Sequence, residues 1–69
     1  MEKQENRLKI LRKEKGLTQT KLANEIGVSK RTIIAWENDE RQIKSDKAQK
    51  LADFFEVPIG YLLGYSDYK

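Results

Sequence analysis

Residues 28–38, VSKRTIIAWEN, decide the fold, because their side chains divide between two faces of one short helix. Ser29 has the type and position of a helix N-cap, so its hydroxyl is expected to accept a hydrogen bond from the amide of Thr32 or its neighbour. One face is suited to a core and consists of Ile33, Trp36 and Glu37. The opposite face combines cations with small or apolar side chains, namely Lys30, Arg31, Ile34, Ala35 and Asn38.

The cations of this second face stand at an unfavourable position. Lys30 and Arg31 occupy the start of the helix, where the positive end of the macrodipole repels each of them by about 0.3–1 kcal/mol. Such departures from local preference are expected at functional sites, and an anionic partner would turn the repulsion into attraction. Two adjacent cations by themselves are more common on solvated surfaces than in binding sites. The rest of the sequence is therefore needed to distinguish these two interpretations.

Length and composition exclude several classes of function. The 69 residues suffice for one small domain. The absence of cysteine and histidine removes disulfides, Cys/His zinc sites and thiol or imidazole catalysis. Without a nucleophile–base pair or a phosphate-cradling glycine loop, we expect no enzyme, no cofactor, no metal and no small-molecule ligand. A reducing cytoplasmic setting fits, and no segment predicts a membrane span or signal peptide.

Charge is distributed unevenly along the chain. Residues 1–36 carry nine Lys/Arg against four Glu, a net charge of +5, whereas residues 37–69 carry five against seven, a net charge of −2. The basic half contains the helix described above. This asymmetry favours a polyanion at one face, although it is weak support taken alone.

The remaining periodicity predicts four more helices around the central one. A first helix starts at Asn6, buries Leu8, Leu11 and Arg12, and stops at Gly16. A second follows an N-cap at Thr18 and ends at Gly27. A fourth, capped by Ser45 or Asp46, turns Ala48, Leu51, Ala52 and Phe55 inward and ends at Val57. A fifth, short one opens with Pro58 and stops at Gly64. We expect a flexible segment over 1–5, one domain over 6–64 and a tail over 65–69.

The connection between the second and third helices is about three residues long and contains Gly27, which is the sequence form of a helix-turn-helix. Residues 17–38, LTQTKLANEIGVSKRTIIAWEN, resemble the phage-repressor/Cro-type (XRE-like) helix-turn-helix family, whose usual form runs LTQ..LA...GVS..TI..WE... The resemblance continues through LADFFEVPIGYLLG and covers about residues 6–64. It departs at Asp39, where the family commonly has glycine, and at residues 43–44, where it commonly has proline. The resemblance implies an all-α, compact five-helix bundle of the lambda-repressor-like type.

The resemblance implies that DNA lies against the second and third helices. In the family the side chain at Gln19 bridges a phosphate and the recognition helix. The other phosphate candidates are Thr18, Thr20, Lys21 and Asn38. Lys30 and Arg31 are the expected base readers, since both can donate to guanine O6 and N7. The Ala35 methyl suits a thymine methyl, and Ile34 either does the same or adds a core or dimer contact.

Two charges fall on faces expected to be buried. Arg12 and Glu37 are each costly there unless paired, so we expect them to meet and tie the first helix to the end of the third, as the corresponding pair does in some family members. The spacing of Trp36 from Ile33 favours core packing over base stacking. Tyr61, Leu62 and Leu63, in the last short helix, are the candidate dimer contact.

Together these features predict a sequence-specific double-stranded DNA-binding transcriptional regulator. A repressor that acts as a homodimer on a near-palindromic operator is the form that the resemblance implies. The alternative is an antitoxin or a module that uses the same fold to hold a protein partner, with DNA binding secondary or autoregulatory.

Overall fold

Five helices make up the regular structure of residues 6–67, the part of the chain that the computed structural model describes. They are α1 (Leu8–Glu14), α2 (Gln19–Ile26), α3 (Lys30–Glu37), α4 (Ser45–Phe55) and α5 (Ile59–Leu62). The prediction of an all-α five-helix bundle is confirmed. The predicted flexible segment 1–5 and the last two residues of the predicted tail lie outside the described residues.

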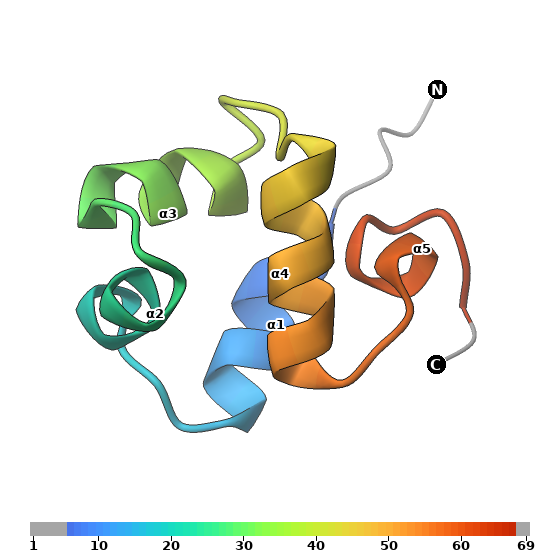
Figure 1. The fold of residues 1–69 in the computed structure, drawn as a ribbon, viewed down its shortest axis with the longest axis horizontal. Helices are drawn as coiled ribbons and strands as arrows, with labels where there is room; N and C mark the ends of the chain where they lie inside the picture. The colour runs from blue at the N-terminus through green and yellow to red at the C-terminus, as the bar shows by residue number, and fades with distance from the viewer. Residues whose placement is uncertain (1–5, 68–69) are drawn as a thin grey trace.

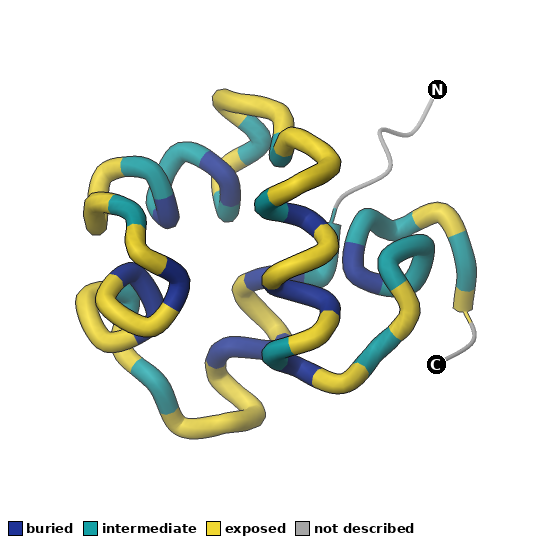
Figure 2. The backbone as a smooth tube through the Cα atoms, in the orientation of Figure 1, coloured by how far each residue is buried: buried dark blue, intermediate teal, exposed yellow. Residues whose placement is uncertain are grey.

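The longest helix, α4, runs through the middle of the molecule (Figure 1). In this view α1 lies behind α4, the α2–α3 pair lies to one side and α5 lies to the other. The buried segments of the backbone turn toward the space between these elements (Figure 2). No helix in the described part of the chain has both the length and the apolar character that crossing a membrane requires. The arrangement leaves the outer sides of α2 and α3 on the surface.

Each helix contributes apolar side chains to one core. Its fully or nearly buried members are Leu8, Leu11, Leu22, Ala23, Ile26, Ile33, Trp36, Ala48, Leu51, Ala52, Phe55 and Leu62. The predicted core role of Trp36 is confirmed, because only 4% of the residue is exposed. The apolar residues predicted to be buried in the first and fourth helices are all in this set, namely Leu8, Leu11, Ala48, Leu51, Ala52 and Phe55.

All five helices end in the same way, with one residue at positive φ followed by a backbone hydrogen bond that closes the last turn. For α2, Gly27 has φ 86°, and the Val28 amide donates to the Ala23 carbonyl over 3.0 Å. This Schellman arrangement satisfies carbonyls that the helix leaves unpaired, and glycine adopts it without steric cost. Asp39 (φ 59°) and Glu56 (φ 58°) fill the corresponding positions after α3 and α4.

Three predicted helix boundaries differ from the structure by one or two residues. The helix α1 begins at Leu8, because the side-chain oxygen of Asn6 accepts the Leu8 amide hydrogen over 3.0 Å. The predicted cap of α4 is wrong: the N-cap is Lys44, which makes no side-chain cap bond. Pro58 is the N-cap of α5 and not its first helical residue.

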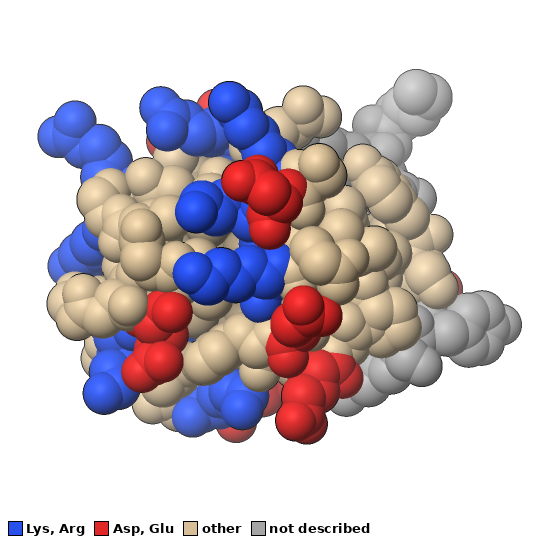
Figure 3. All heavy atoms as spheres, in the orientation of Figure 1, with Lys and Arg blue, Asp and Glu red and all other residues tan. Residues whose placement is uncertain are grey.

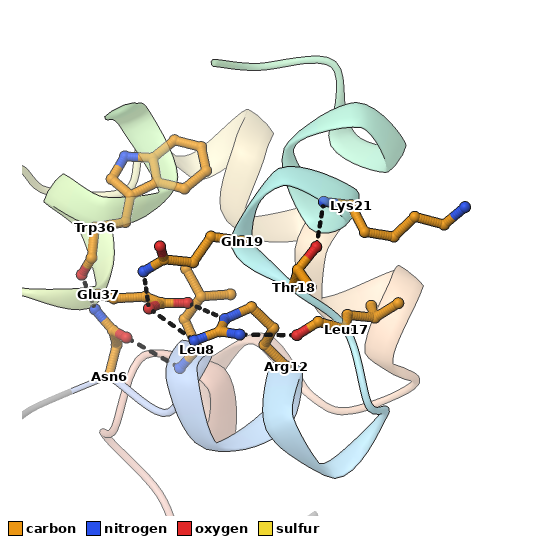
Figure 4. Close-up of polar contacts among 9 residues, drawn as sticks. All are labelled: Asn6, Leu8, Arg12, Leu17, Thr18, Gln19, Lys21, Trp36 and Glu37. Atoms are coloured by element: carbon orange, nitrogen blue, oxygen red, sulfur yellow. Dashed lines mark hydrogen bonds and ion pairs between the residues drawn. The ribbon is translucent and has the colours of Figure 1, made fainter. Parts of the chain in front are cut away.

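The predicted pair of buried charges is present and joins α1 to α3, and Gln19 adds a contact from α2 (Figure 4). The Nε atom of Arg12, in α1, lies 2.6 Å from the Oε2 atom of Glu37, in α3, and the Glu37 side chain is only 2% exposed. A second guanidinium nitrogen of Arg12 donates to the Leu17 carbonyl at 2.8 Å. From α2, Gln19 Nε2 donates to Glu37 Oε1 over 3.1 Å. We call Arg12, Gln19 and Glu37 the buried polar triad.

Two residues before α1 make contacts that the sequence did not predict. The Asn6 amide nitrogen donates to the Trp36 carbonyl at 2.9 Å and so caps the end of α3. The Arg7 guanidinium donates to the carbonyls of Tyr61 and Ser66 and to the carboxylate of Asp67, and it lies 4.2 Å from the centre of the Tyr61 ring. Two residues of the predicted tail, Ser66 and Asp67, are therefore held against the start of α1.

The buried polar triad predicts an unequal response to removal of two acidic side chains. Glu37→Ala should cost about 3–5 kcal/mol of unfolding free energy, because it leaves the Arg12 cation buried without its partner. Glu40→Ala should cost under about 0.5 kcal/mol, because Glu40 is exposed. Urea unfolding followed by circular dichroism measures both. Equal midpoints for the two variants would refute the structural role of the pair.

The two acidic residues at positive φ predict a gain in stability on substitution by glycine. Glu56→Gly should stabilise the domain by about 0.5–1 kcal/mol, because glycine removes the left-handed strain at a helix end. Asp39→Gly should gain less, since Asp tolerates this conformation better than Glu and its carboxylate lies 3.4 Å from the Asn6 amide. Thermal unfolding gives the values.

Glu40→Gly is the matched control, because it makes the same Glu-to-Gly change as Glu56→Gly and lies beside Asp39, but at a residue without positive φ. It should be neutral or destabilising by up to about 1 kcal/mol. If Glu56→Gly lost as much stability as Glu40→Gly, the strain argument would be wrong.

Candidate nucleic-acid interface

The outer face of α3 presents its cations without partners. Ser29 caps the helix as predicted, and its hydroxyl oxygen accepts the Thr32 amide hydrogen over 3.2 Å. Lys30 and Arg31 follow as the first two helical residues and are exposed. Within residues 6–67, neither cation makes an ion pair or a hydrogen bond through its side chain. Both are therefore available to an anion, at the end of a helix that already favours one.

The other residues predicted to contact bases, Ile34 and Ala35, are less exposed than Lys30 and Arg31; we call these four residues the reading face. Ile34 and Ala35 are half-buried, while Asn38 is exposed and is the C-cap of α3. Ile34 lies outside the group of half-buried apolar residues that pack against the core. Of the interpretations left open for Ile34, an additional core contact is thus the one that the packing does not support.

The start of α2 flanks this face with polar side chains. Thr18 is the N-cap, and its hydroxyl oxygen accepts the Lys21 amide hydrogen at 3.0 Å, which leaves its own O–H free to donate. Thr20 and Lys21 are exposed, and the Lys21 side chain extends away from the buried polar triad (Figure 4). These positions suit contacts to phosphate, which need donors and positive charge but no base-reading geometry.

Gln19 connects the two helices of the motif. It is half-buried, and one of the two N–H groups of its amide is used by Glu37. Because a carboxylate only accepts hydrogen bonds, Glu37 fixes which end of the amide faces inward. The second N–H group and the carbonyl oxygen of Gln19 remain for a ligand at the surface. The contact with α3 that the family resemblance implied for this side chain is present here through Glu37.

A hollow of about 260 Å³ extends the candidate interface beyond α3. It is lined by Arg31, Thr32, Ala35, Glu40 and Arg41. Arg41 and Glu40 belong to the loop between α3 and α4 and were not predicted as site residues. The available signal was a cation three residues after Asn38, but its position depends on the left-handed turn at Asp39, which the sequence did not specify. The hollow brings a third cation to the edge of the reading face.

The predicted dimer contact is corrected at one residue. Leu62 is fully buried in the core of its own chain, so its side chain offers no surface to a partner. Tyr61 and Leu63 are half-buried, and the Tyr61 ring is covered on one face by Arg7. The error arose because a helix of four residues makes only about one turn, so no repeat of the pattern is available to assign its faces. The described residues contain no cluster of His, Cys, Asp or Glu suited to a metal ion.

Comparison with known proteins places this geometry in a family. The family profile described as helix-turn-helix matches residues 8–62. The chain is 39% identical over 62 residues to the cryptic phage CTXphi transcriptional repressor RstR of Vibrio cholerae, an alignment that covers 90% of this chain and 56% of that protein. It is 42% identical over 62 residues to the uncharacterized HTH-type transcriptional regulator MJ0272 of Methanocaldococcus jannaschii, with 90% and 94% covered.

A third relative, the uncharacterized HTH-type transcriptional regulator YobD of Bacillus subtilis, is 36% identical over 61 residues, which are 88% of this chain and 54% of YobD. The chain thus spans about half the length of RstR and of YobD, and nearly all of MJ0272. The matched region contains all five helices and the buried polar triad. The chain belongs to the helix-turn-helix family of the phage-repressor/Cro type (XRE-like).

Proposed function

We propose that this chain is a sequence-specific regulator of transcription that binds double-stranded DNA through α3. The observation that carries the proposal is the pair of exposed cations without partners, Lys30 and Arg31, at the start of a helix fixed by the buried polar triad. Both cations oppose the macrodipole of their own helix, and phosphate or a guanine edge would relieve this cost. The reported relatives are named as transcriptional regulators, one of them as a repressor.

In the proposed complex α3 lies in the major groove, where donor and acceptor patterns distinguish all four base pairs. Arg31 donates with both arms of its guanidinium to O6 and N7 of guanine, and Lys30 donates to a neighbouring base. The apolar groups of Ile34 and Ala35 contact thymine methyls. Side chains at the start of α2 and the end of α3 hold the flanking phosphates, namely Thr18, Gln19, Thr20, Lys21 and Asn38.

Two copies are proposed to bind a near-palindromic operator, with half-sites about one helical turn apart, roughly 34–36 Å. Tyr61 and Leu63 are the side chains of the α5 segment that remain candidates for the contact between copies. Repression then follows from occupancy, because a bound dimer that overlaps a promoter excludes the polymerase. This last step rests on the family membership and on the name of the phage relative.

The assigned roles predict two distinguishable effects on DNA binding. Arg31→Ala should cost about 1–3 kcal/mol of binding free energy and relax the preference at one base pair, because it removes a base contact. Lys21→Ala should weaken binding to all duplexes to a similar degree, because phosphate contacts carry no sequence information. Selection of bound sites from random duplex DNA measures both effects. A selected-site profile unchanged by Arg31→Ala would remove the base-reading assignment.

Salt dependence separates DNA binding from the alternative of a module that only holds a protein partner. The observed association constant for duplex should fall with salt, with a log–log slope near −0.9 for each phosphate neutralised. Lys21→Ala should reduce the magnitude of that slope by about 1. Lys13→Ala, on the exposed part of α1, is the matched control and should leave the slope unchanged. A mixed-sequence duplex that fails to bind in dilute buffer would overturn the proposal.

A further inference from the structure

A second hollow, of about 240 Å³, opens between α3 and the start of α4 and is not used by the contacts proposed above. Its apolar lining residues are Val28, which is half-buried in the α2–α3 turn, and Trp36. An apolar cavity of about 150 Å³ is large enough for benzene, so this hollow has room for one Leu or Phe side chain. Its interior therefore favours an apolar group.

The rim of this hollow is cationic. Arg41, Lys44 and Lys47 line it, against a single carboxylate from Asp46. A further cation, Lys50, lies one turn along α4, with its Nζ atom 4.0 Å from the position that a Cβ at Gly27 would occupy, in the same α2–α3 turn as Val28. Figure 3 shows Lys and Arg side chains gathered over α3, the following loop and the adjacent face of α4, with uncharged surface and one group of acidic side-chain atoms among them. We call this rim and its apolar floor the α3–α4 hollow.

We infer that the α3–α4 hollow is the docking site for an acidic amphipathic segment of a partner protein. Charge complementarity selects the occupant: carboxylates on the segment face Arg41, Lys44 and Lys47, while one large apolar side chain enters the hollow. A nucleic acid backbone satisfies the cations but brings no such side chain to the Val28 and Trp36 floor. A neutral apolar segment fills the floor but leaves the cations unmatched. Only a segment that combines both chemistries uses the whole hollow.

Docking there interferes with the recognition face. Thr32 and Arg41 line both the α3–α4 hollow and the hollow that contains Arg31 and Ala35. A segment seated in one therefore meets a ligand of the other at these two shared residues, and its carboxylates repel phosphate. The inferred partner acts as a competitor of DNA, a consequence that rests on the proposed function. Docking itself does not depend on it.

Trp36 provides a direct readout, because it is the only tryptophan in the sequence and it lines the hollow. The probe is a short blocked synthetic peptide, free of tryptophan, in which a Leu-Phe pair is flanked by runs of Asp and Glu. Titration without DNA should change the Trp36 emission saturably. A peptide with Gly-Ser in place of Leu-Phe should bind at least about fivefold more weakly, because it leaves the floor empty.

The chain variant that tests the rim is Lys44→Glu with Lys47→Glu, which should weaken binding of the acidic Leu-Phe peptide by about tenfold or more. Lys9→Glu is the matched control on the exposed surface of α1 and should change the affinity less than about twofold. Circular dichroism checks that each variant is folded. Equal weakening by both variants, or equal affinity of the two peptides, would overturn the inference.

Two further outcomes separate this inference from the proposed function. A chain that binds the peptide but no duplex would support the docking site and refute DNA binding. If no saturable change appears up to about 1 mM peptide while Lys44→Glu with Lys47→Glu weakens duplex binding, the hollow belongs to the DNA interface and the inference fails. When both ligands bind, the peptide should displace a fluorescent duplex. If the peptide still displaced the duplex from the Lys44→Glu, Lys47→Glu variant, the inferred docking site would also be contradicted.

Discussion

The geometry of the candidate interface depends on a carboxylate that is buried where three helices meet. Removing the charges of Arg12 and Glu37 from water costs several kcal/mol for each ion, and only a well-formed pair with further hydrogen bonds compensates that cost. Here both Glu37 oxygens accept hydrogen bonds, and a third guanidinium N–H group is taken by the Leu17 carbonyl. Moving α1 against α3 would therefore leave a buried charge unpaired. Moving α2 would remove the Gln19 hydrogen bond and leave Oε1 of Glu37 with only its 3.4 Å contact to Arg12.

This constraint explains how α3 tolerates an unfavourable start. Two cations in its first turn cost about 0.3–1 kcal/mol each, a large amount for a helix of eight residues. Other contacts compensate this cost. Ser29 caps the beginning of the helix, the Asn6 amide donates a hydrogen bond to the Trp36 carbonyl in its last turn, and Ile33 is fully buried. The exposed side chains of α3 are therefore not needed to stabilise the helix, and they can be suited to a ligand instead.

The sequence predicted the features that depend on neighbouring residues, and those in which burying an unpaired charge would cost much free energy. The N-caps of α2 and α3 follow from Thr18 and Ser29, and the Arg12–Glu37 pair follows from two charges on otherwise apolar faces. Less was predictable where geometry depends on distant packing. Glu56 carries no sign of its left-handed conformation, the side chain of Leu62 in a single helical turn has no periodicity, and Arg41 reaches the interface only through the turn at Asp39.

The two hollows beside α3 share residues, and this determines how a partner would regulate the domain. Allosteric control requires two arrangements of the structure that a ligand can bias. The buried polar triad opposes a second arrangement, since tilting α2 against α3 separates Gln19 from Glu37. Direct competition requires only overlap, and Thr32 and Arg41 supply it at the junction of the two hollows. A rigid helix pair with overlapping surfaces therefore favours regulation by exclusion over regulation by change of shape.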